Sequence, residues 1–103
     1  MIEITRCNDS ITIKGHAGYA EHGKDIVCAG VSALAQTMIS SLLQLTNDNI
    51  EYHISSGNIE IKHWNLSEAA QLLIDSFFIG VKMMADTYLN HIRIVQALQD
   101  VKR

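Results

Sequence analysis

The first sixteen residues alternate between apolar and polar side chains. In the segment MIEIT isoleucine occupies every second position, and SITIKGH repeats this pattern after the turn-forming residues 8–10. A period of two is typical of a strand that buries one face. The pattern therefore predicts a β-hairpin over residues 2–16.

The same alternation returns in the middle of the chain. The segment IEYHIS places Ile50, Tyr52 and Ile54 on one side, and NIEIKHW follows it after Ser56-Gly57. Serine and glycine between two alternating runs form a typical hairpin turn. We expect a second β-hairpin over residues 50–64.

A helical period separates the two hairpins. Apolar residues recur at steps of three and four from Val27 to Leu45, which predicts an amphipathic helix. Asp25 precedes the first of them and is a suitable N-cap.

A second helix is predicted from NLSE onward, where Asn65 and Glu68 have the spacing of a capping box. Its apolar residues are more numerous than one face requires, because LLI at 72–74 and FFI at 77–79 extend around the helix. We expect the second apolar side to be covered by another subunit in a homodimer. The alternative is that the C-terminal segment covers it.

The C-terminal pattern fits two structures. NHIRIVQ alternates well enough for a short fifth strand near 91–95, whereas IVQALQDVKR would also suit a helix. We favour the strand, followed by a helical or frayed tail. The expected fold is α+β, one domain over residues 1–103: hairpin, helix, hairpin, helix and a possible strand, with two main helices packed on a mixed sheet.

Composition excludes several classes of protein. A net charge of −3 gives no reason to expect direct binding to nucleic acid. The N-terminus lacks the layout of a secretory signal, and we expect no apolar run that approaches the roughly 20 residues needed to span a bilayer. We therefore expect a cytoplasmic protein without a membrane partner, in which Cys7 and Cys28 are reduced thiols.

Cys28 is the candidate nucleophile. If Asp25 caps the helix, Cys28 occupies the third helical position, where free N–H groups and the helix dipole favour a thiolate. The same N–H groups are candidates to bind the oxyanion of an acyl-transfer intermediate. The alternative is a buried cysteine that packs beside Val31 and Ala35.

A cysteine nucleophile needs a base, and two histidines are near. His16 ends the predicted second strand, which would fix the direction of its ring, while His22 lies in a glycine-rich loop. We prefer His16. The alternative for either is an exposed loop histidine, and His53, His63 and His91 are read as surface or sheet-face residues.

Neither a metal site nor a phosphate loop is indicated. His16, His22 and Cys28 are each six residues apart, a wider spacing than zinc ligands usually have. The glycines match neither common phosphate-binding motif. We expect no metal and no cofactor.

Residues 15–34 read GHAGYAEHGKDIVCAGVSAL and resemble the signature of the ribosomal-processing cysteine proteases, the bacterial Prp family. The segment GVKMMADTY near 80–88 resembles the family's later helix end. The matching residues are Gly15-His16-Ala17, Gly23-Lys24-Asp25, Ile26-Val27-Cys28-Ala29 and Val31-Ser32.

The resemblance implies a dimeric Cys–His protease that trims an N-terminal extension from one large-subunit ribosomal protein, with aromatic residues just before the cut. Cys28 would be the nucleophile and His16 the base, reacting through an acyl-enzyme. Asp25 is the acidic residue of the motif, and either caps the helix or orients His16. Ser32, one turn beyond Cys28, is a supporting residue that either faces the site or bonds to its own helix.

The loop over residues 17–24, with Gly18, Tyr19 and Gly23, is expected to close over a bound peptide.

Two departures from the family concern the C-terminal part, where Leu89 replaces a proline after Tyr88 and the tail beyond Gln96 differs.

Two other functions stay open from the residues. One is a non-catalytic dimeric module that binds a ribosomal protein or assembly factor. The other is a thiol redox protein, for which Cys7 would have to act as the resolving cysteine.

Overall fold

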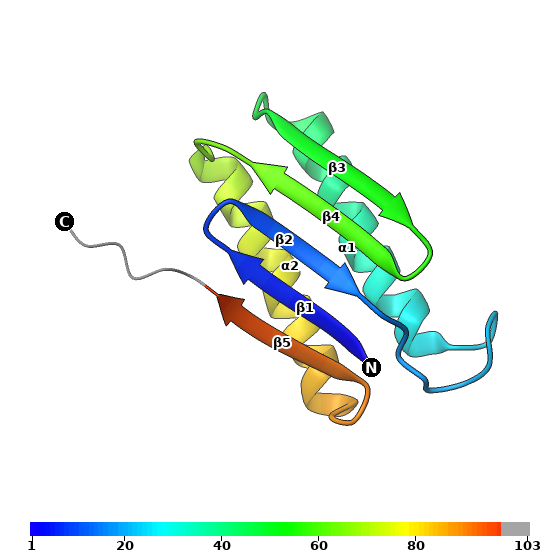
Figure 1. The fold of residues 1–103 in the computed structure, drawn as a ribbon. Coiled ribbons are helices and arrows are strands. Elements are labelled where there is room, and N and C mark those ends of the chain that lie inside the picture. The colour runs from blue at the N-terminus through cyan, green and yellow to red at the C-terminus, as the bar shows by residue number, and fades with distance from the viewer. Residues whose placement is uncertain (98–103) are drawn as a thin grey trace.

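The computed structural model describes residues 1–97, which form a five-stranded sheet and two helices. Along the chain these are β1 (Ile2–Cys7), β2 (Ser10–Lys14), α1 (Ile26–Leu45), β3 (Ile50–Ser55), β4 (Asn58–His63), α2 (Glu68–Thr87) and β5 (Ile92–Ala97). The strand order is β3-β4-β2-β1-β5 (Figure 1). Three neighbouring pairs are antiparallel and β1–β5 is parallel, so the predicted α+β fold with a mixed sheet and both hairpins is confirmed.

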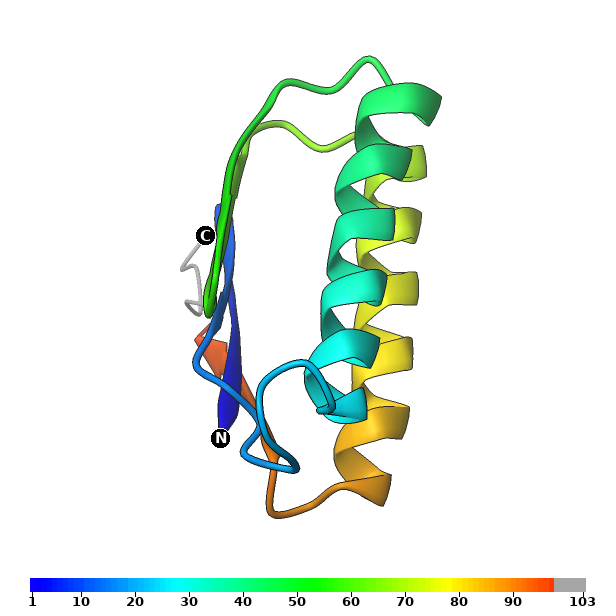
Figure 2. The same ribbon diagram turned by 90° about the vertical axis from the view of Figure 1, so that its right-hand side faces the viewer.

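Both helices cover the same face of the sheet, which gives two layers (Figure 2). The alternating isoleucines point into the space between the layers, as their period of two requires. Each fully buried side chain of this kind contributes about 1.5–3 kcal/mol relative to an exposed one. The largest fully buried side chains are Ile4, Ile11, Leu42, Ile61, Ile74, Val27, Val31 and Val81.

The edge strand β3 carries exposed apolar side chains. Ile54 pairs with buried Ile59, and Tyr52 pairs with buried Ile61, so both face the helical side of the sheet. Both are nevertheless exposed. This end of the sheet therefore keeps apolar surface open beside the start of α1.

The predicted capping box of α2 is wrong. The N-cap is Ser67, whose hydroxyl accepts a hydrogen bond from Ala70 N at 3.1 Å. Asp48 accepts from both Ser67 N and Ser67 Oγ at 2.7 Å, which fixes the cap to the connection between α1 and β3. Asn65 instead adopts a left-handed conformation (φ 46°), which asparagine tolerates better than most residues.

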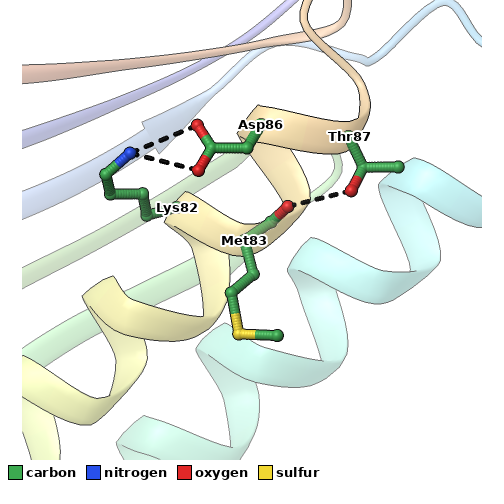
Figure 3. A network of polar contacts seen from close by, with 4 residues as sticks. All are labelled: Lys82, Met83, Asp86 and Thr87. Atoms are coloured by element: carbon green, nitrogen blue, oxygen red, sulfur yellow. Dashed lines mark hydrogen bonds and ion pairs between the residues drawn. The ribbon is translucent and has the colours of Figure 1, made fainter.

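The C-terminal end of α2 is held by local bonds (Figure 3). Lys82 Nζ pairs with the carboxylate of Asp86 at 3.1 Å, and Thr87 Oγ1 donates to the carbonyl of Met83 at 3.1 Å. Tyr88 N then donates to Met84 O, and the chain turns into β5. The helix end is closed without the proline that the family pattern led us to expect.

The predicted fifth strand is confirmed and is longer than expected. β5 pairs with β1 over six residues, from Ile92 to Ala97. Residues 96 and 97 therefore belong to the strand and not to a tail. The helical or frayed tail predicted beyond them falls on residues 98–103, which lie outside the described part of the chain.

Nothing in residues 1–97 covers the outer side of α2. Leu72, Ile79 and Met83 are 70%, 65% and 67% exposed, whereas Phe77 and Phe78 are buried. Up to Ala97 the C-terminal segment joins the sheet and does not cover this side. The predicted homodimer thus stays a prediction, with an apolar surface available for it.

α1 is apolar enough to match a membrane-spanning helix by length and composition, with a mean hydropathy of 1.8 over its best window. The expectation that no apolar run reaches this length was wrong for residues 26–45. The core helix of a globular domain passes the same test, and α1 buries Val31, Ala35 and Leu42 among the side chains of the core.

Candidate active site

Cys28 lies in the first turn of α1, where the sequence predicted it. The N-cap is Asp25, whose Oδ1 accepts hydrogen bonds from Val27 N at 3.0 Å and Cys28 N at 2.9 Å. The thiol is half-buried beside the core, and its Sγ accepts a hydrogen bond from Ala17 N at 3.2 Å. The sulfur of Cys28 therefore lies at the start of a helix, with a main-chain N–H directed at it.

Asp25 performs a second task that the sequence did not indicate. Its Oδ2 accepts from Tyr19 N at 2.9 Å and Ala20 N at 3.3 Å, so one carboxylate joins the glycine-rich loop to the helix. Donation from Cys28 N, with the N–H groups of Tyr19, Ala20 and Val27, holds the pKa of Asp25 below its ordinary value against a smaller opposing effect of desolvation. Of the two jobs predicted for Asp25, capping is confirmed, and the hydrogen bonds of its carboxylate within residues 1–97 go to main-chain N–H groups.

The oxyanion site expected at the helix start is wrong. The N–H groups of Val27 and Cys28 bond to the side chain of Asp25, and Ala29 N bonds to the carbonyl of Asp25 at 3.0 Å. These donors are therefore occupied. The N–H of Ala17 points at the sulfur on which a thioester would form.

His16 reaches the site from a different position than predicted. β2 ends at Lys14, so His16 lies two residues beyond it and no strand pleat fixes its ring. Its carbonyl accepts from Met1 N at 2.6 Å, and Gly15 N donates to Gly57 O at 2.9 Å. The imidazole lies against Gly57 in the β3–β4 turn: a Cβ added to Gly57 would stand 2.7 Å from its Nε2.

One cleft of about 790 Å³ contains the candidate side chains. Its walls come from the β2–α1 loop, the first turns of α1 and the β3–β4 turn, and they include His16, Asp25, Cys28 and Ser32. Isoleucines from the sheet, among them the exposed Ile54, add apolar surface. His16 and Cys28 thus face the same space, although within residues 1–97 no hydrogen bond joins the imidazole to the sulfur.

Most of the remaining predicted site residues also line the cleft, and Tyr19 lies beside it. Ser32 lines the cleft, and its hydroxyl accepts from Gln36 Nε2 at 2.8 Å, so it is bonded to a side chain and not to its own helix backbone. Gly18 and Gly23 line the cleft with positive φ angles of 68° and 87°. His22, which we ranked below His16, also lines it.

Tyr19 belongs to an aromatic cluster beside the cleft. Its ring meets those of Tyr88 and His91 edge-on, with centroids 5.5 Å and 5.4 Å apart. His91 Nδ1 lies 2.9 Å from the carbonyl oxygen of Ala17. Sequence reasoning read His91 as a surface residue, and no local pattern could have found it, because it lies 74 residues from its partner.

Other chemistry has less support. Among residues 1–97, no group of three His, Cys, Asp or Glu side chains is arranged to hold a metal ion. Cys7 and Cys28 are free thiols. Cys7 ends β1, whereas the first residue of that strand, Ile2, lines the cleft, so roughly 17 Å of strand lies between them. A disulfide requires Cα atoms within about 7 Å, which excludes Cys7 as a resolving cysteine in this fold.

Comparison with known proteins gives the family. The family model described as cysteine protease Prp matches residues 1–93. The ribosomal processing cysteine protease Prp of Staphylococcus aureus is 29% identical over 87 residues, covering 82% of each chain. The protein of the same name from Mycoplasma genitalium is 30% identical, covering 91% of this chain and 94% of its own.

A crystal structure of the S. aureus protease with a covalently linked product peptide superimposes with a TM-score of 0.89 and 24% identity, over 93% of this chain and 99% of that chain. The matched residues contain the whole cleft, from Ile2 to Ile59. The chain belongs to the Prp family of ribosomal-processing cysteine proteases.

Proposed function

We propose that this protease removes an N-terminal extension from a large-subunit ribosomal protein, with Cys28 as nucleophile and His16 as general acid and base. One observation carries the proposal: the half-buried sulfur of Cys28 lies at a capped helix start in the same cleft as His16. The names of the family's curated members and the covalently held peptide of the S. aureus protease support the reaction class.

The proposed chemistry needs two half-reactions. The thiolate of Cys28 attacks the carbonyl carbon before the cut, and the tetrahedral intermediate collapses as protonated His16 gives its proton to the leaving amine. The released amine is the new N-terminus of the mature protein, and the extension remains as a thioester on Cys28. Neutral His16 then takes a proton from water, whose oxygen attacks the thioester and frees the extension and the thiol.

His16 has to move for this chemistry, because its ring lies against Gly57 in the peptide-free chain. Catalytic hydrogen bonds are often long or unformed before substrate binds. His16 is exposed, and the next residue, Ala17, already bonds to Cys28. We therefore expect rotation of the side chain, without movement of the sheet, to bring the imidazole to the sulfur.

Ala17 N–H is the proposed oxyanion donor. In the resting chain it donates to Cys28 Sγ at 3.2 Å. When the sulfur bonds to the substrate carbon, negative charge moves to the adjacent oxygen, which lies within reach of the same donor. A fixed donor that already points to where this charge develops stabilises the transition state without reorganisation.

We propose that the enzyme acts as a cytoplasmic homodimer. The two free thiols suit a reducing compartment. Leu72, Ile79 and Met83 form an apolar stripe along the outer side of α2, of the kind that subunit interfaces cover. Sedimentation of the wild type and of an Ile79→Lys variant tests this: a dimer that the variant splits supports the interface, and a wild-type monomer contradicts it.

The experiment that tests the function is cleavage of a peptide that spans the extension and the first mature residues of the host's ribosomal protein. Mass spectrometry of the products should show one cut by the wild-type chain and none by Cys28→Ala, with binding retained. Binding without any cut by the wild type would instead support a non-catalytic module. Cutting by Cys28→Ala at the wild-type rate would refute the nucleophile.

A further inference from the structure

His91 is fixed between α2 and β5 by its own backbone. His91 N donates to Tyr88 O at 2.9 Å, and Ile2 N donates to His91 O at 2.9 Å. The residue is thus tied to the end of α2 and to the first residue of β1. Figure 2 shows this α2–β5 turn and the β2–α1 loop at the same end of the molecule. A side chain on such a support holds its position well.

The imidazole of His91 uses that support to hold the active-site loop. Its Nδ1 lies 2.9 Å from Ala17 O. A carbonyl oxygen only accepts hydrogen bonds, so Nδ1 carries the hydrogen and donates it. Tyr19, packed edge-on at 5.4 Å, restricts rotation of the ring.

Ala17 is therefore bound on both sides. Its carbonyl accepts from His91, and its N–H donates to Cys28 Sγ. Ala17 is 2% exposed, so the residue is also enclosed by the core. Gly18 follows at once with a φ of 68°, and a Cβ built there would meet nothing within 4 Å. The bond from His91 thus stands where the anchored part of the chain ends and the open glycine loop begins.

We propose that His91 is a positioning residue of the active site, which holds Ala17 so that the Ala17 N–H stays on the sulfur of Cys28 and His16 stays beside it. This proposal rests on the proposed role of Cys28 as nucleophile. His91 touches neither the sulfur nor the substrate in this role. It acts through Ala17, and without it the freedom of Gly18 would extend back to the residue that the thiolate depends on.

Two substitutions separate positioning from simple packing. His91→Asn keeps an N–H donor near the place of Nδ1, whereas His91→Leu keeps bulk and removes the donor. His53→Leu is the matched control, because His53 is an exposed histidine on β3 that does not line the cleft. Each variant is compared in melting temperature, in kcat and KM for the extension peptide, and in the rate at which iodoacetamide alkylates Cys28, resolved from Cys7 by peptide mass spectrometry.

His91→Leu should lower both kcat and the alkylation rate of Cys28 about tenfold, because Ala17 loses the bond to its carbonyl and its N–H is no longer held on the sulfur. KM should change little, and His91→Asn should recover most of both rates. His53→Leu should match the wild type. If His91→Asn loses as much of both rates as His91→Leu, His91 is a packing residue and the proposal is wrong. The same holds if the loss of both rates in His91→Leu is accounted for by the fraction of the variant that is unfolded at the assay temperature.

The same data separate this proposal from the proposed function. If His91→Leu slows the alkylation of Cys28 but the wild type does not cut the extension peptide, the positioning role is supported and the ribosomal substrate is contradicted. Normal alkylation of Cys28 in His91→Leu, with normal cleavage, would leave the protease intact and refute the role of His91.

Discussion

The imidazole of His16 lies directly against Gly57, a residue 41 positions later in the chain. Gly57 has a φ of 70°, and any Cβ there would stand 2.7 Å from His16 Nε2 and 3.1 Å from Cε1. Real Cβ atoms essentially never come closer than 3.0 Å, so the ring would have to move. The β3–β4 turn thus sets the resting place of the proposed base.

Gly57→Ala should therefore displace His16 and lower kcat/KM about tenfold. The backbone strain of a non-glycine residue at positive φ costs about 1–2 kcal/mol in any case. Gly23→Ala controls for that strain in a thermal melt, because its φ is 87° and its Cβ would meet nothing within 4 Å. Equal melting temperatures of the two variants, with kcat/KM of Gly57→Ala about tenfold below that of the wild type, would support the contact. Full activity of Gly57→Ala would show that the resting position of His16 is unimportant.

Asp25 links the helix cap to the glycine loop, and two variants separate these tasks. Asp25→Ser keeps a cap acceptor for α1 but has no second oxygen for Tyr19 N and Ala20 N. We expect its melting temperature to stay near the wild type while amide exchange at residues 19 and 20 accelerates and cleavage slows several-fold. Asp25→Ala should lower the melting temperature by several degrees as well. Slow exchange at both amides in Asp25→Ser would contradict the second task.

His63 should make stability depend on pH between about 5 and 7. It is 6% exposed, and burial lowers its pKa below the ordinary 6.5, with Asp9 opposing and Arg6 assisting the shift. The unfolded chain therefore takes up a proton as the pH falls through 6.5, before the folded chain does, and stability is lost in that window. The carboxylates with lowered pKa values, Asp25 among them, act only below about 4.5.

Melting temperatures at pH 7.5 and 5.0 check this prediction. The wild type should be less stable at pH 5.0, and His63→Leu should show a smaller difference between the two conditions. His53→Leu, at an exposed position on β3, should keep the wild-type difference. An unchanged difference in His63→Leu would place the pH dependence elsewhere.

Cys7→Ser should leave peptide cleavage within about twofold of the wild type. Cys7 lies at the far end of β1 from the cleft, too far away to form a disulfide with Cys28 in the folded chain. Activity measured with and without a reductant should respond equally in both proteins. A large loss of activity in Cys7→Ser would restore the redox alternative.

The local parts of the fold were predictable from the sequence. Strand and helix periods differ, so the alternation at Ile2 and Ile4 and the helical spacing from Val27 onward identified their elements. Asp25 as the N-cap, and with it the place of Cys28 in the first turn, followed from the same local reasoning. The cap of α2 was misassigned because asparagine and serine are equally good caps, and only the contact with Asp48 selects Ser67.

The long-range parts of the site were not predictable from one sequence. The contact of His16 with Gly57 depends on how β4 pairs with β2, and the bond from His91 to Ala17 depends on the parallel pairing of β5 with β1. The oxyanion prediction failed for a local reason. An N-cap side chain accepts from the second or third N–H of its helix, so the predicted cap at Asp25 already implied that the Cys28 N–H is occupied.

The most direct test of Cys28 and His16 is the intact mass of the protein during the first turnover of an extended ribosomal peptide, quenched in acid. We predict a transient adduct on Cys28 whose mass is that of the N-terminal extension less one water, with its formation slowed at least a hundredfold in His16→Ala. Cleavage without any adduct on Cys28, or an adduct that forms equally fast in His16→Ala, would contradict the proposed mechanism.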